Sequence, residues 1–108
     1  MEDVLAKATD LGKAIRATEK FRALREAEAA VVAVPESVRL AEALGTLQEE
    51  RVAAARSGKA LGPEFEDRLQ KIVAAAGLDP RIQGLSLAQK SFQELVDRVN
   101  RTMLAELQ

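Results

Sequence analysis

One amphipathic stripe limits the possible folds of this chain more than any other feature. After Asp79-Pro80, positions that would share one face of a helix follow one another at alternating steps of three and four residues. They are Ile82, Leu85, Gln89, Phe92, Val96, Val99 and Met103. A helix turns once in about 3.6 residues, so this spacing forms a heptad seam. Asp79 suits the N-cap and Pro80 the first helical position. The sequence predicts a long final helix whose apolar edge packs on another helix.

The N-terminal third of the chain carries a similar stripe. Its positions are Val4, Ala8, Leu11, Ile15 and Thr18, with Phe21 and Leu24 continuing it after a shift. The spacing predicts one long helix over residues 2–33. Pro35 disfavours the α conformation at Val34, which ends that helix.

Two further helices are predicted between these long ones. One covers residues 36–56 and closes at Gly58, which suits a left-handed position. The other opens with Pro63 and closes at Gly77. The composition, rich in Ala, Leu, Glu and Arg, favours helix throughout.

The expected fold is all-α: an elongated four-helix protein with long N- and C-terminal helices packed antiparallel and short helices between. The two long helices would each span about 40 Å, at 1.5 Å per residue. A compact globule of this length has a diameter of roughly 34 Å. We therefore expect a single helical domain, residues 1–108, whose apolar seams extend beyond what one chain covers.

Composition excludes several kinds of chemistry. The chain has 108 residues with a net charge of -1, no Cys and no His. Thiolate metal sites, Cys nucleophiles and His-based acid–base catalysis are therefore excluded. The acidic N-terminus is unlike a signal peptide, and no apolar run approaches the roughly 20 residues of a membrane span. We expect a cytoplasmic protein that is not an enzyme and has no cofactor, metal or membrane partner.

Two groups of charges are candidate sites. The carboxylates Glu49-Glu50 and Glu64/Glu66/Asp67 are typical of solvated surfaces and helix starts rather than of a buried catalytic pair. Lys13, Arg16 and Lys20 share one face of the predicted first helix and could contact phosphates. No aromatic platform accompanies them, so direct nucleic-acid binding is not expected.

Gln89 is the informative exception in the seam. A polar residue at a seam position costs packing but can fix the register and the choice of partner. The alternative is that Gln89 reaches the edge of a monomer core. The predicted oligomer and partner interface consists of Leu11, Ile15, Phe21, Leu85, Gln89, Phe92, Val96, Val99 and Met103. A two-fold homodimer is the commonest way to cover such seams.

Three segments carry a resemblance to a known family. They are DLGKAIRATEKFRAL (10–24), AEALGTLQEERVAAARSGK (41–59) and LDPRIQGLSLAQKSFQELVDRVNRTM (78–103). In their order the chain resembles the YlbF/YmcA family of small helical bacterial regulators, over about Val4 to Leu107. Within the third segment, Ala88-Gln89 matches a family position with a small residue followed by Glu or Gln.

The resemblance implies a function that the residues alone do not. Members are all-α, tend to self-associate, and regulate competence, sporulation and biofilm formation without catalysis. They act in a complex with other proteins, including family members, and influence mRNA processing through a membrane-anchored ribonuclease. Some bind an iron–sulfur cluster through Cys, which this chain lacks. The expected function is a regulatory protein-interaction module; the alternatives are an RNA-binding helical protein and a chaperone-like helical hairpin.

Overall fold

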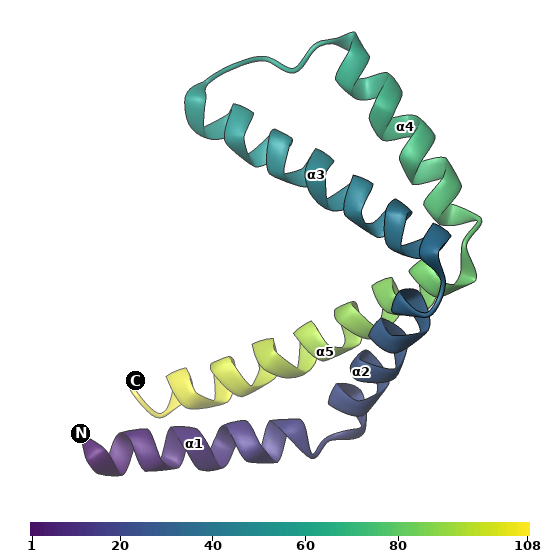
Figure 1. Ribbon diagram of the computed structural model, residues 1–108. Helices are drawn as coiled ribbons and strands as arrows, with labels where there is room; N and C mark the ends of the chain where they lie inside the picture. Colours follow the sequence, from purple (N-terminus) through teal and green to yellow (C-terminus); the bar gives the residue numbers. More distant parts are fainter. The chain divides into compact units, whose positions relative to one another are not determined.

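The computed structural model describes residues 1–108 and consists of five helices joined by short connections, with no strand (Figure 1). In chain order they are α1 (Glu2–Arg16), α2 (Glu19–Val32), α3 (Pro35–Ser57), α4 (Pro63–Gly77) and α5 (Pro80–Ala105). The all-α prediction is confirmed. The predicted number of helices is wrong, and the helices between the ends are not all short, because α3 has 23 residues. A membrane span is absent, since each helix is too short or too polar to cross a bilayer.

The predicted first helix is two helices, divided at Ala17-Thr18. The Thr18 hydroxyl donates to the backbone carbonyl of Ile15 at 2.7 Å and accepts from the backbone N–H of Phe21 at 3.2 Å. Phe21 is the third residue of α2, so Thr18 caps this helix. The sequence pattern places Thr18 in an apolar stripe. In the structure, its side chain instead lies at the end of α1 and caps the start of α2.

The other predicted helix boundaries agree with the structure. Val34 is extended, with φ -122° and ψ 111°, and Pro35 opens α3. Gly58 closes α3 with φ 73°, and the Lys59 N–H donates to the carbonyl of Ala54 at 3.0 Å. Pro63 opens α4 as predicted.

Asp79 caps α5 as the sequence predicted. Its Oδ1 accepts the backbone N–H of Arg81 at 2.9 Å and that of Ile82 at 3.4 Å. These N–H groups belong to the first turn and have no partner inside the helix, so the carboxylate satisfies them.

The chain divides into two compact units. The terminal unit comprises Met1–Ala29 with Leu85–Gln108, and the central unit comprises Ala30–Gly84. The division falls within α2 and within α5, and both helices run through it without a break.

Every buried residue lies in the central unit. The set is Val31, Ser37, Leu47, Ala54, Phe65, Ala76 and Ile82. Helices α3 and α4 pack against each other in this unit and contribute most of these side chains. The central unit therefore has a small core of its own.

The terminal unit has no fully buried residue. Its apolar side chains are at best half-buried, and α1 buries none of its residues. This unit therefore hides less apolar surface than its sequence offers. Hydrophobic burial is the main favourable term in folding, so the unit gains little stability from its own packing.

Candidate functional site

All nine residues of the predicted interface belong to the terminal unit. The clearest contact among them joins Phe21 of α2 to Phe92 of α5, whose ring centroids are 5.8 Å apart with the planes tilted by 56°. The guanidinium of Arg25 lies 4.9 Å from the Phe21 centroid. The tilted ring pair connects α2 to α5, while the cation lies over a ring of its own helix, α2.

A shallow hollow of about 300 Å³ lies between α1 and α5. Three predicted residues line it: Leu11, Val99 and Met103. The other lining residues, which are not among the predicted ones, are Leu95, Arg98 and Thr102. Ile15, Leu85 and Val96 are half-buried.

Gln89 lies outside the packed face of α5 in this chain. Its side chain is exposed, whereas its neighbour Ala88 is half-buried. The heptad spacing placed Gln89 in the seam, but the half-buried positions Leu85, Ala88, Phe92, Leu95 and Val99 keep the same alternation of three and four with Ala88 in place of Gln89. An interface role for Gln89 therefore requires another molecule.

Exposed apolar side chains collect on the two end segments of the terminal unit. Val4 and Leu107 are 66% and 81% exposed, and Leu5, Met103 and Leu104 also face solvent. Of these, only Met103 was predicted as interface. The signal for Leu107 was present, since it lies four residues after Met103 and continues the helical spacing.

In the central unit, α3 and α4 enclose a buried ring. Phe65 is 3% exposed, with the guanidinium groups of Arg51 and Arg68 5.9 Å and 5.8 Å from its centroid. Arg68 also donates two hydrogen bonds to the Glu50 carboxylate, at 2.9 Å and 3.4 Å. This pair connects α4 to α3, and no sequence pattern indicated it because its partners lie 18 residues apart.

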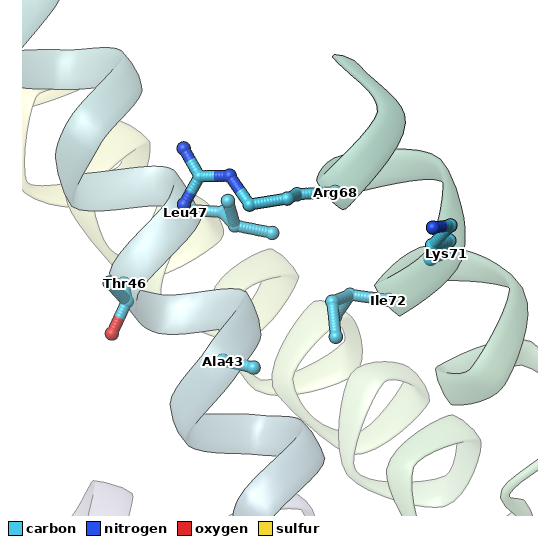
Figure 2. Close-up of a pocket in the computed structure, with 6 residues that line it drawn as sticks. All are labelled: Ala43, Thr46, Leu47, Arg68, Lys71 and Ile72. Atoms are coloured by element: carbon cyan, nitrogen blue, oxygen red, sulfur yellow. The ribbon is translucent and has the colours of Figure 1, made fainter. Parts of the chain in front are cut away.

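Beside this cluster lies an open hollow of about 330 Å³. It is lined by Ala43, Thr46, Leu47, Arg68, Lys71 and Ile72. Figure 2 shows the Arg68 side chain extending from α4 toward Leu47 on α3, with Ile72 between the two helices. The surface is largely apolar, with two cations at its α4 edge.

The predicted basic face does not form. Lys13 and Arg16 belong to α1, while Lys20 belongs to α2 beyond the break at Thr18. The three cations therefore do not share one continuous helical face.

The best-defined polar contact in the central unit joins Ser37 to Asp79. The Ser37 hydroxyl, which is fully buried, donates to Asp79 Oδ2 at 2.6 Å. This bond, with the N–H groups of Arg81 and Ile82, holds the pKa of the Asp79 carboxyl below its usual value. A carboxylate with a lowered pKa is a weak base, so the pair suits capping rather than proton transfer. No three carboxylates come together in a way that could hold a metal ion.

Comparisons with known proteins cover almost the whole chain. Two curated relatives, each called "UPF0342 protein" and from two strains of Lactobacillus delbrueckii subsp. bulgaricus, are 28% identical over 103 residues. The match covers 95% of this chain and 88% of each relative.

A solved structure shares the fold. It is titled "Protein of Unknown Function (DUF964) from Bacillus stearothermophilus", with a TM-score of 0.86 and 23% identity. The similarity covers 97% of this chain and 92% of that one. The family model described as "Control of competence regulator ComK, YlbF/YmcA" matches residues 4–108. With 105 of 108 residues matched by that model, the chain belongs to the YlbF/YmcA family.

Proposed function

We propose that this protein is a non-enzymatic regulator that self-associates through its terminal unit and binds partner proteins. The family description, control of a competence regulator, agrees with a regulatory role and names no reaction. The observation that carries the proposal is the absence of any fully buried side chain in the terminal unit. Its apolar residues gain stability only if a further surface covers them.

A second copy of the chain is the simplest cover. In the proposed homodimer, α1 and α2 pack antiparallel to α5, and the seams of two chains face each other around a two-fold axis. Leu11 shares a hollow with Val99, and Phe21, later in the chain, contacts Phe92, earlier in α5; this order supports the antiparallel packing of α1 and α2 on α5.

The regulatory setting comes from the family. By resemblance, the protein would act in the cytoplasm, in a complex with other proteins that affects developmental regulation or mRNA processing. Direct RNA binding is not part of the proposed function, because the three cations that could contact phosphates are divided between two helices.

Self-association is tested by sedimentation velocity and light scattering on the full chain at micromolar concentration. The unsubstituted chain should behave as a dimer. Val4→Asp and Met103→Asp each introduce a charge at an exposed apolar position of the terminal unit, and each should shift the chain toward monomer.

Val73→Asp is the matched control. Val73 is 52% exposed but belongs to the central unit, so its charge should leave the dimer unchanged. Circular dichroism should show the same helix content for all variants. A folded, concentration-independent monomer in the unsubstituted chain would reject the proposal.

A further inference from the structure

The hollow between α3 and α4 has an apolar floor. Leu47 is almost fully buried and Ile72 is half-buried, so both present only part of their surface to it. Ala43 leaves space because its side chain ends at Cβ (Figure 2). The volume of about 330 Å³ exceeds one large apolar side chain, so the hollow can accept such a group.

The charges around the hollow are unequal on its two edges. Helix α4 contributes Arg68 and Lys71, one turn apart, whereas α3 contributes the neutral Thr46. The charge of Arg68 is already matched by Glu50. None of the ion pairs in the structure involves Lys71. The α4 edge therefore keeps one free positive charge beside an apolar floor.

We propose that this hollow, from here on called the α3–α4 groove, binds an amphipathic helix of a partner protein. Acidic residues flank the apolar face of that helix. One large aliphatic or aromatic side chain enters between Ala43 and Ile72, and a carboxylate of the same helix lies over Lys71. The inference rests on the proposed function and assigns its partner-binding step to a surface separate from the one proposed for self-association.

The open side of the hollow favours a helix as the bound segment. The hollow is open to solvent, so a bound group is covered from one side only. A helix supplies the missing cover with its own backbone and neighbouring side chains, while one apolar side chain enters the hollow. The charge at the α4 edge sets which flank of that helix is acidic.

The test uses synthetic peptides and the full-length protein labelled with nitrogen-15. The first peptide is an amphipathic helix of about four turns with Leu on one face and Glu beside it. The second has Lys in place of each Glu, and the third has Ala in place of each Leu. Binding is followed by the backbone amide resonances of Ala43, Thr46, Leu47, Lys71 and Ile72.

The acidic peptide should shift these resonances in a saturable way, and the other two should not. Lys71→Glu should raise the Kd of the acidic peptide about fivefold and improve binding of the basic one. Ala43→Leu fills the hollow and should also weaken binding. Lys90→Glu, at an exposed position of α5, makes the same change of charge elsewhere and should have no effect.

Several results would overturn the proposal. They are the absence of shifts at the groove, equal binding of acidic and basic peptides, or equal loss with Lys71→Glu and Lys90→Glu. Lys71 is exposed, so its substitution remains decisive even if Ala43→Leu impairs folding.

The oligomeric state of the same samples separates this inference from the proposed function. If Lys71→Glu dissociates the dimer, the groove holds a second copy and the partner-helix proposal is wrong. If no peptide shifts the groove resonances while Val4→Asp still dissociates the dimer, this inference fails and the proposed self-association stands.

Discussion

Ser37 Oγ donates a hydrogen bond of 2.6 Å to Asp79 Oδ2, which joins positions 42 residues apart in the chain. The contact connects the first turn of α3 to the start of α5 within the central unit. Asp79 thus has two roles, since Oδ2 accepts from Ser37 while Oδ1 caps α5. Without the Ser37 hydroxyl, Asp79 Oδ2 would lose its hydrogen-bond donor, while Oδ1 could still cap α5.

Ser37→Ala should lower the free energy of unfolding by about 1 kcal/mol, because a part-buried hydrogen bond to a charged acceptor is lost. Urea denaturation followed by circular dichroism measures the change. Ser86→Ala, at an exposed position of α5, is the control and should change stability little. Equal stability of the Ser37→Ala protein and the unsubstituted protein would contradict the role of this contact.

The stabilisation by Asp79 should depend on pH. The Ser37 hydroxyl, then the backbone N–H groups of Arg81 and Ile82, lower the pKa of this carboxyl from 3.8. A lowered pKa in the folded state means that the stabilisation is present above 3.8 and is lost as pH falls through the folded value. The advantage of the unsubstituted chain over Asp79→Asn in urea unfolding should therefore shrink as pH falls from about 5 to below 3.8. A constant difference across that range would rule out this linkage.

Thr18→Ala should lower the free energy of unfolding by about 1 kcal/mol, since α2 loses its N-cap. A continuous helix through this position would give the opposite sign, because Ala favours a helix interior over Thr. Denaturation therefore distinguishes the break from the uninterrupted helix that the stripe predicts. Thr102→Ala, an exposed position near the end of α5, provides the comparison.

Two glycine substitutions should have opposite effects. Gly84 lies inside α5 with nothing within 4 Å of a Cβ, so Gly84→Ala should raise the free energy of unfolding by about 1 kcal/mol. Gly58 has equally open surroundings but φ 73°, so Gly58→Ala should lower it by about 1 kcal/mol. Thermal melts of the two variants check both signs, and a gain at Gly58 would contradict the left-handed end of α3.

Gln89→Leu should change association more than folding. Gln89 is exposed in the chain, so the substitution removes no internal contact. If Gln89 selects the register of the proposed dimer, Leu should strengthen association and allow additional species. Sedimentation and melting at several concentrations give the answer. One unchanged dimer species with ordinary melting would argue against a specificity role.

Helix ends were predictable wherever a backbone rule applies. Pro35 and Pro63 fix φ and lack an N–H, so they open helices, and Gly58 closes one because it adopts a positive φ. Asp79 was predictable as a cap because its side chain reaches its own helix start. The break at Thr18 was missed although the same capping rule covers it, because apolar residues resume after it at Phe21 and Leu24 and the shift in their spacing does not by itself indicate a helix end.

The candidate sites were less predictable. The heptad pattern predicts a seam along α5 that includes Gln89, whereas Gln89 is exposed in the chain and its neighbour Ala88 is half-buried. The groove beside Phe65 depends on which faces of α3 and α4 meet. Neither Arg68 with Glu50 nor Ile72 opposite Ala43 has a sequence signature, because each pair spans two helices.

The sequence by itself determined that this chain is helical, where most of its helices begin and end, and which family it resembles, because these follow from local backbone preferences and residue order. Only the tertiary structure decided that the buried core lies in the central unit and that the terminal unit leaves its apolar seam partly uncovered. Burial depends on which helix surfaces contact each other, and these helices can be far apart in the sequence. That information is absent from any single helix.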